Sequence, residues 1–409
     1  MRAATFERRD ALVRRNTVLL ALAQGFVQMS FPVLLVIGGP ASMDLTGRDV
    51  SAGILWATYF VAAASGAVVI GRWMDRVGRR PGLLLAYALV GTAGIAAALS
   101  IGAGSFSGLL LSTIPFGAAL GGANLGRGAV ADMYPTERRG RAVGILLAAG
   151  TVGAVGSPLI AAGIQAIAGD ESLLPWAIVP IGAAGAFACA LLVRPDPRDL
   201  AIVDPEASRR GGRGPRELLG VPAFRIAVVA GAVGYMAMVG VMGVTPNALH
   251  AAHHGGTAIS VIVSVHIAGM FAFSPLIGRW MDRVGRRAAL LAGCIASIAG
   301  ALVAATELGA VVVGVGLFLI GIGWSATFLG ATAVISDITV PNERAGALGL
   351  TDLLTSLTSA VAGLTGGVVL ESAGYGVLGI ALAALVALSL VVVVRLREPS
   401  PAGVPTGLR

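Results

Sequence analysis

The decapeptide GRWMDRVGRR at Gly71–Arg80 occurs a second time, unchanged, at Gly278–Arg287. The two copies lie about half a chain length apart in a sequence of 409 residues. A looser echo follows each copy, with DMYPTER beginning at Asp132 and DITVPNER beginning at Asp337. Chance does not produce an identical match of this length at this spacing, so we infer that the chain consists of two related halves.

The sequence between these loops is strongly apolar. Hydrophobic residues make up 56% of the chain and charged residues only 12%, whereas a soluble protein carries charge on roughly a quarter of its positions. An apolar run of about 20 residues crosses a bilayer as a helix, because backbone groups in lipid must be paired internally. We therefore predict an all-α membrane protein with twelve transmembrane helices in two six-helix, pseudo-symmetric halves. The predicted spans are 17–38, 50–72, 82–102, 106–132, 142–166, 174–193, 224–248, 257–279, 288–306, 309–336, 347–371 and 374–395.

The composition around the middle of the chain predicts a domain boundary. Positions 194–223 are rich in proline, glycine and arginine, which is typical of a polar linker. The expected halves are therefore 1–193 and 224–409, joined by a cytoplasmic linker at 194–223.

The arginines indicate how the helices are oriented. All 29 basic residues are arginine, and all but Arg48 and Arg127 fall on one side of the predicted membrane. By the positive-inside rule both termini are expected in the cytoplasm, and we expect a multi-pass protein of a bacterial inner membrane. The net charge of +8 then reflects topology and contact with anionic lipid, and predicts no nucleic-acid partner. The two cysteines, Cys189 and Cys294, fall within predicted spans and form no disulfide framework.

The repeated loop resembles the signature of the major facilitator superfamily, Gly-x-x-x-Asp-Arg-x-Gly-Arg-Arg. The matching residues are Gly71, Asp75, Arg76, Gly78, Arg79 and Arg80 in the first copy, and Gly278, Asp282, Arg283, Gly285, Arg286 and Arg287 in the second. The resemblance implies a monomeric secondary transporter that works by alternating access, with a substrate site near mid-membrane. It also implies that the motif latches the cytoplasmic gate and does not hold substrate. Asp132, Glu137 and Arg138 are expected partners of this latch, and the alternative is that the charges only fix topology.

Methionines and histidines gather in the seventh and eighth predicted spans. Met238 and Met242 are four residues apart, as are His266 and Met270, so each pair lies on one helix face. Thioether sulfur selects Cu(I), and imidazole also suits copper. The two motifs resemble those of the CcoA-type copper importers of the superfamily. The leading hypothesis is therefore copper import with these four residues as ligands, copper being the substrate and no resident cofactor being expected.

The short loop before the eighth span carries the other three histidines. His250, His253 and His254 would lie on the outer side of the membrane, where they could capture a metal ion or simply form a polar turn. Asp352 in the eleventh span is a candidate for proton coupling, and the alternative is a charge that stabilises a helix N-terminus.

A second hypothesis is proton-coupled transport of a small organic solute, as in a drug exporter or a riboflavin-like importer. The methionines would then line an apolar cavity, with Trp324 and Gln28 supplying further contacts. Drug exporters of this superfamily often carry an acid in the first span and an arginine early in the fourth, where this chain has no acid and Ser112. The sequence contains no HExxH, CxxC, GxSxG or P-loop motif, so we predict a transporter and not an enzyme.

Overall fold

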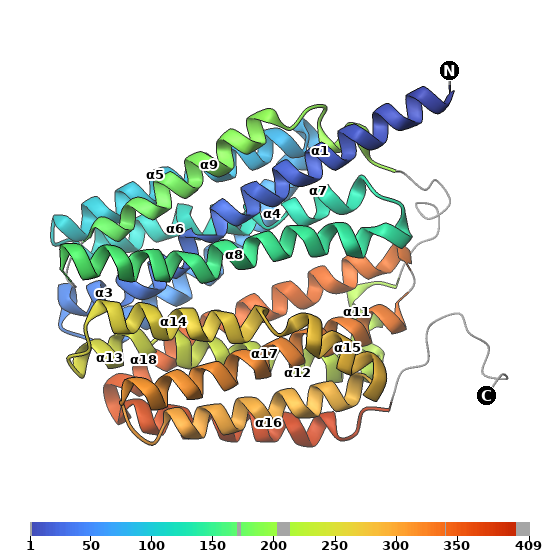
Figure 1. Cartoon of the computed structure of the whole chain (residues 1–409). Coiled ribbons are helices and arrows are strands. Elements are labelled where there is room, and N and C mark those ends of the chain that lie inside the picture. The colour runs from blue at the N-terminus through green and yellow to red at the C-terminus, as the bar shows by residue number, and fades with distance from the viewer. Residues whose placement is uncertain (1, 170–172, 203–212, 340, 398–409) are drawn as a thin grey trace. The chain divides into compact units, whose positions relative to one another are not determined.

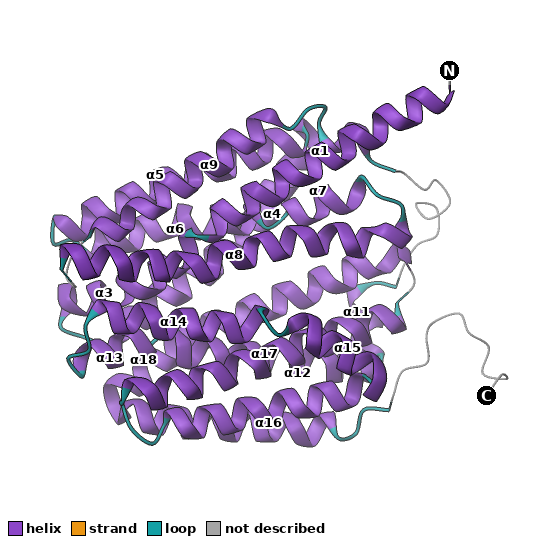
Figure 2. Cartoon of the chain, in the orientation of Figure 1, coloured by secondary structure: helices purple, strands orange, loops and turns teal. Residues whose placement is uncertain are grey.

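The computed structural model describes residues 2–169, 173–202, 213–339 and 341–397 (Figure 1). Every regular element within these ranges is helical (Figure 2), and eleven helical stretches are long and apolar enough to cross a membrane. The chain divides into two compact units. Unit 1 comprises Met1–Val203 with Leu249–Ser264, and unit 2 comprises Asp204–Ala248 with Val265–Arg409. The all-helical membrane fold predicted from the sequence is confirmed.

Unit 1 contains the helices of the first half of the chain. They are α1 (Arg2–Gln28), α2 (Ser30–Val33), the π-helix η1 (Leu34–Gly38), α3 (Gly39–Thr46), α4 (Val50–Val77), α5 (Arg79–Gly102), α6 (Phe106–Ala123), α7 (Gly126–Asp132), α8 (Thr136–Ala168), the 3₁₀ turn η2 (Leu174–Ala177), α9 (Ile178–Leu192) and the 3₁₀ turn η3 (Pro197–Leu200).

The second half of the chain contributes the remaining helices. They are α11 (Pro215–Gly220), α12 (Pro222–Met242), α13 (Thr245–Ala251), α14 (Gly256–Phe271), α15 (Ser274–Val284), α16 (Arg286–Ala304), α17 (Ala310–Ile338) and α18 (Pro341–Val393). The unit boundary falls inside α13 and inside α14. The halves predicted at 1–193 and 224–409 stay a prediction, and positions 203–212 of the expected linker lie outside the described residues.

The last stretch accounts for the difference between eleven observed and twelve predicted spans. It runs over Gly346–Val393 without interruption by a loop, and it is 48 residues long. Gly374 within it has a φ of 84° and a ψ of 170°, a conformation that glycine adopts at no steric cost. The helix is broken there, between the spans predicted at 347–371 and 374–395. The first span is longer than predicted, Arg8–Thr46, because the helix continues through the π-helical segment.

Glycines let the helices of each unit pack closely. In unit 1, α4 packs against α6, and a Cβ atom on Gly121 would lie 2.0 Å from the carbonyl oxygen of Ala63. In unit 2, α16 packs against α17, and a Cβ atom on Gly300 would lie 2.5 Å from the carbonyl oxygen of Gly316. Small residues at helix crossings permit this approach in membranes, where association depends on packing.

The exposed helix faces are apolar along the spans. Large hydrophobic side chains such as Val69, Leu99, Ile167, Val311 and Leu388 have more than half of their surface exposed. Patches of this kind in a soluble protein would promote aggregation, whereas lipid covers them in a membrane. The chain is therefore a multi-pass membrane protein.

Candidate functional site

The two copies of the repeated loop adopt the same geometry. In the first, the Arg79 guanidinium lies 3.1 Å from a carboxylate oxygen of Asp75 and 3.4 Å from one of Asp132. In the second, Arg286 lies 3.5 Å from Asp282 and 3.0 Å from Asp337. Arg79, at the start of α5, therefore joins α4 to the end of α7, and Arg286, at the start of α16, joins α15 to the end of α17. Asp132 is a partner of Arg79, as the sequence suggested.

The last arginine of each copy binds a different helix end. Arg80 donates from Nε to the carbonyl oxygen of Ala190 at 3.2 Å and from Nη2 to that of Leu191 at 3.0 Å, at the end of α9. Arg287 donates to the carbonyl oxygen of Val394 at 2.8 Å, just after α18. A cation at a helix C-terminus satisfies carbonyls that have no partner within the helix and interacts favourably with the helix dipole.

The glycine that precedes these arginines is required by the backbone. Gly78 has a φ of 112° and Gly285 a φ of 95°, and each residue lies between two consecutive helices. A side chain at such a position would be strained, so the conserved geometry of the turn depends on glycine. The first copy thus connects α4, α5, α7 and α9, and the second connects α15, α16, α17 and the end of α18.

A carboxylate that the sequence did not indicate supports the first copy. Asp196 accepts hydrogen bonds from the backbone N–H groups of Arg79 at 3.1 Å and Arg80 at 2.8 Å. It thereby binds the first turn of α5, where helix N–H groups have no helical partner. Asp196 lies 116 positions further along the chain than Arg80, and nothing in its local sequence indicates this contact.

The four predicted copper ligands are all buried in unit 2. Met238 and Met242 have 2% and 3% of their surface exposed, Met270 has 7%, and His266 has none. The neighbours of the two pairs belong to different helices. A Cβ atom on Gly240, between the two methionines of α12, would contact Leu382 of α18 at 3.0 Å. By contrast, α14 crosses α17 where a Cβ atom on Gly321 would contact the backbone of His266 at 2.5 Å.

The His266 ring has one nitrogen bound and one without a partner. Nδ1 lies 2.6 Å from the carbonyl oxygen of Leu317, and because a carbonyl only accepts, Nδ1 carries the proton. Nε2 is buried and has no hydrogen-bond partner among the described residues. A neutral imidazole fixed in this way presents a lone pair at Nε2, the form in which histidine binds a metal.

The histidines between α13 and α14 form part of a turn. His253 has a φ of 60°, its N–H donates to the carbonyl oxygen of His250, and the N–H of His254 donates to that of Leu249. This is the Schellman arrangement that ends a helix, here α13. The His250 ring lies 3.1 Å from a carboxylate oxygen of Asp44. Within the described residues no three His, Cys, Asp or Glu side chains form a group that could hold a metal ion.

Asp352 lies well inside a helix. Since α18 begins at Pro341, Asp352 is three turns past the helix start and is half-buried. The helix dipole acts within about the first turn, so it does not explain a charge at this position. Both cysteines are free, Cys189 half-buried and Cys294 buried.

An aromatic cluster in unit 2 surrounds Trp324. Tyr235 of α12 and Phe271 of α14 meet its ring edge-on with centroids 5.5 and 5.6 Å away. Phe328 stacks on it at 5.1 Å with an interplanar angle of 10°. Trp324 is 6% exposed, and its indole Nε1 has no hydrogen-bond partner in the described part of the chain. The sequence singled out Trp324 but not its ring partners, because three separate helices bring them together.

A second aromatic cluster lies in unit 1. Phe31 packs against Trp56 and Tyr59 with ring centroids 5.5 and 5.4 Å away. It precedes the π-helix η1, a rare distortion that occurs frequently at functional sites. Gln28, the second contact suggested for an organic solute, is half-buried one turn before Phe31.

Comparison with known proteins places this geometry in a family. The family description "Major Facilitator Superfamily" matches residues 17–250 and 227–409. The chain is 27% identical to the uncharacterised MFS-type transporter YddS of Bacillus subtilis, over 95% of this chain and 92% of that one. It is 28% identical to the riboflavin transporter RfnT of Brucella anthropi, over 95% and 97%.

A solved structure supports the same fold. The nucleoside transporter NupG superposes with a TM-score of 0.68 at 15% identity, over 93% of this chain and 100% of that one. At this level of identity the likeness concerns the fold alone. Because the family match extends over nearly the whole chain and its signature loop occurs in both halves, the protein belongs to the major facilitator superfamily and is a membrane transporter, not an enzyme.

Proposed function

We propose that this transporter carries a planar aromatic solute of the flavin type by alternating access. The observation that carries the proposal is the buried ring cluster around Trp324, with an indole N–H that has no hydrogen-bond partner among the described residues. Ligand sites are typically apolar and aromatic with a few polar groups that fix orientation. The similarity to a riboflavin transporter over nearly the full length of both chains supports the same class of substrate.

The cluster suits a flat, polar-edged molecule. Aromatic pairs gain about 0.5–1.5 kcal/mol beyond area burial, in stacked or edge-to-face arrangements. A ring system inserted beside Trp324 keeps contacts of this kind with Tyr235 and Phe328. A buried N–H without a hydrogen-bond partner costs about 1–3 kcal/mol. A carbonyl oxygen of the solute that accepts from Nε1 removes this cost, which favours binding.

The test is uptake of labelled riboflavin by cells that neither make nor import it. We expect Trp324→Phe, which keeps a ring and loses the N–H, to raise KM about tenfold, and Trp324→Ala to abolish uptake. Trp176→Phe is a matched control, because Trp176 belongs to unit 1 and is also buried, with an Nε1 that bonds to none of the described residues. Normal membrane levels of wild-type protein without flavin movement in either direction would refute the proposal.

Copper import is the second candidate, and the unpartnered Nε2 of His266 favours it. Met270 lies one turn further along α14, and Met238 and Met242 are the proposed thioether ligands on α12. In cells without their own copper importer, Met242→Leu and His266→Ala should abolish copper uptake. Trp324→Phe should leave it unchanged, whereas it impairs flavin uptake, so the same variants separate the two candidates.

The orientation and the gate belong to the same proposal. We expect a monomer in a bacterial inner membrane with both termini in the cytoplasm, since nearly all arginines fall on one side. The ion pairs of Arg79 with Asp132 and of Arg286 with Asp337 would latch the cytoplasmic end.

Asp352 remains the candidate for proton coupling, and the outer-loop histidines remain candidates for metal capture. Labelling of cysteines introduced near Arg48 and near Arg283, from outside intact cells, tests the orientation.

A further inference from the structure

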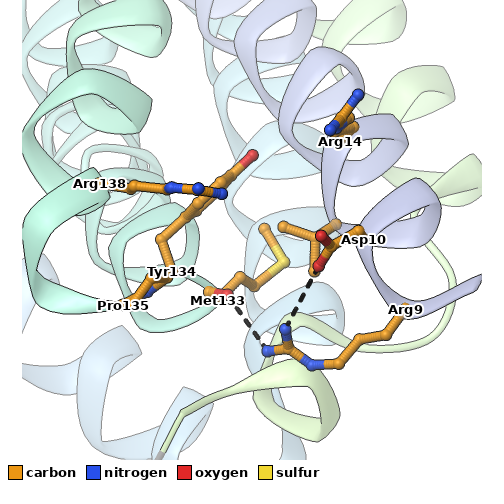
Figure 3. Close-up of a pocket in the computed structure, with 8 residues that line it drawn as sticks. Arg9, Asp10, Arg14, Met133, Tyr134, Pro135 and Arg138 are labelled. Atoms are coloured by element: carbon orange, nitrogen blue, oxygen red, sulfur yellow. Dashed lines mark hydrogen bonds and ion pairs between the residues drawn. The ribbon is translucent and has the colours of Figure 1, made fainter. Parts of the chain in front are cut away.

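A small pocket lies at the arginine-rich end of unit 1 (Figure 3). Its walls come from the start of α1 and from the turn between α7 and α8. The polar and charged groups that line it are Arg9, Asp10, Arg14, Tyr134 and Arg138, with Met133 between them. Neither the transport proposal nor the repeated loop uses this pocket.

One of the three arginines is already bound within the unit. Arg9 donates from Nη2 to the carbonyl oxygen of Leu200 at 2.8 Å and to that of Met133 at 3.3 Å. It also lies 3.9 Å from a carboxylate oxygen of Asp10. Arg9 therefore connects the walls and pairs with Asp10, the one acid among the described residues that line the pocket.

The other two arginines have no such partners. Arg14 and Arg138 are exposed, and neither guanidinium group has an ion pair or hydrogen bond with the described residues. In Figure 3 the Arg138 guanidinium lies beside the ring of Tyr134, while Arg14 projects from the facing helix. The Tyr134 hydroxyl is 2.9 Å from the hydroxyl of Thr17, which fixes its position. Two guanidinium groups and a phenol thus line one small pocket, in which Asp10 pairs with Arg9.

We propose that this pocket binds a phosphate group through Arg14 and Arg138, with the Tyr134 hydroxyl as a further donor. Guanidinium groups bind phosphate oxygens in pairs and remain charged at every accessible pH. Basic pockets between transmembrane helices on the cytoplasmic side bind anionic lipid head groups, and the positive-inside rule assigns this end to the cytoplasm. The phosphate belongs either to an anionic phospholipid or to a soluble phosphate compound.

The pocket lies next to the ion pair of the first repeated loop. Met133, which lines it, directly follows Asp132, the partner of Arg79 in the first copy of the repeated loop. Ile202 donates its backbone N–H to the Asp132 carbonyl oxygen at 2.8 Å. A phosphate that joins α1 to α8 therefore braces the segment on which the Arg79–Asp132 pair depends.

The experiment is native mass spectrometry of the purified full-length protein with phosphatidylglycerol, with phosphatidylcholine, or with inorganic phosphate and glycerol 3-phosphate. We expect wild type to retain one phosphatidylglycerol, and the pair Arg14→Gln with Arg138→Gln to bind it about tenfold more weakly. The matched control is Arg8→Gln with Arg141→Gln, which removes the same charge from exposed arginines of α1 and α8 outside the pocket. Retention by this control supports a defined site.

The remaining outcomes are equally decisive. Equal loss in both double variants would show general attraction to the surface and overturn the proposal, as would no anion binding by wild type. Competition by glycerol 3-phosphate without lipid retention would support the site and identify a soluble source. The pair Arg14→Lys with Arg138→Lys should keep part of the binding, which excludes misfolding as the cause of a loss. Thermal unfolding of every variant in phosphatidylcholine alone checks that the fold is intact.

Discussion

At the scale of single residues, a buried polar atom without a hydrogen-bond partner among the described residues lowers stability, so it indicates a role in function. Trp324 keeps its indole N–H in an apolar cluster where no described residue accepts from it. Replacing Trp324 by Phe removes this N–H and keeps an aromatic ring in the cluster. We expect unfolding stability to change by less than about 1 kcal/mol, because the desolvation cost of the N–H disappears as some packing is lost.

The measurement is thermal unfolding of purified Trp324→Phe beside riboflavin uptake by the same variant. A raised KM for uptake with unchanged stability identifies a substrate contact. A large fall in stability would mean instead that the N–H has a structural partner and that the ring cluster is only core packing.

His253 illustrates a residue whose backbone conformation explains its position. It takes a φ of 60° at the end of α13, where glycine is the residue usually found. We expect His253→Gly to raise stability by about 1 kcal/mol, since a side chain in the left-handed region costs about this much. His254→Gly is the control and should not stabilise, because His254 has no positive φ. Thermal unfolding distinguishes the two, and a destabilised His253→Gly would show that its imidazole makes a contact that matters more.

At the scale of helices, the crossings depend on glycines whose missing side chains leave room for a neighbouring backbone. Gly121 of α6 faces the carbonyl oxygen of Ala63 in α4, whereas a Cβ atom on Gly128 of α7 would meet nothing within 4 Å. We expect Gly121→Ala to lower stability by about 1–3 kcal/mol through overpacking. Gly128→Ala should be neutral or slightly stabilising, because alanine favours helix more than glycine does.

Fluorescence-detected gel filtration after heating measures this pair of variants directly. The prediction requires a lower transition temperature for Gly121→Ala than for Gly128→Ala. Equal temperatures would mean that α4 and α6 separate at little cost, and that the close crossing does not stabilise unit 1.

The sequence predicted the helices well because apolar run length decides a membrane span almost alone. It named Asp132 with Glu137 and Arg138 as expected partners of the motif, and of these three Asp132 forms an ion pair with Arg79. It could not predict the support from Asp196 or the rings around Trp324. Each of those contacts joins two residues far apart in the sequence. At least one of the two residues belongs to no repeated or periodic sequence pattern. The split of the last long helix at Gly374 was visible only as a gap between two predicted spans.

At the scale of the whole molecule, both ends of the predicted linker are anchored, each to its own unit. Asp196 binds the first turn of α5 in unit 1. Arg213 binds Glu343 near the start of α18 and donates to the Ile338 carbonyl oxygen at 2.6 Å in unit 2. A freely moving linker therefore does not extend over the whole of 194–223.

The ion pair of Arg213 with Glu343 in unit 2 predicts an energetic coupling between these two residues. Glu343 is only 6% exposed, and Arg213 donates to it from its backbone N–H and from two guanidinium nitrogens. The hydrogen bonds to Glu343 raise the pKa of Arg213 above its ordinary value. Arg213 therefore contributes its full stabilisation at every pH below that ordinary pKa, which includes every accessible pH. Removing Arg213 alone leaves the buried Glu343 carboxylate without its cationic partner. This lowers the free energy of unfolding more than removing both charges does.

We therefore expect Arg213→Gln to lower stability more than the double change Arg213→Gln with Glu343→Gln. The double-mutant cycle should give a coupling free energy of about 1–3 kcal/mol, as measured by thermal unfolding. Arg216→Gln controls for the lost charge, because Arg216 is an exposed arginine three positions away. Additive single effects would mean that Arg213 and Glu343 do not act as a pair and that the linker is held from one end only. Coupling accompanied by slower transport when the pair is intact would show that this anchor limits the movement of the two halves.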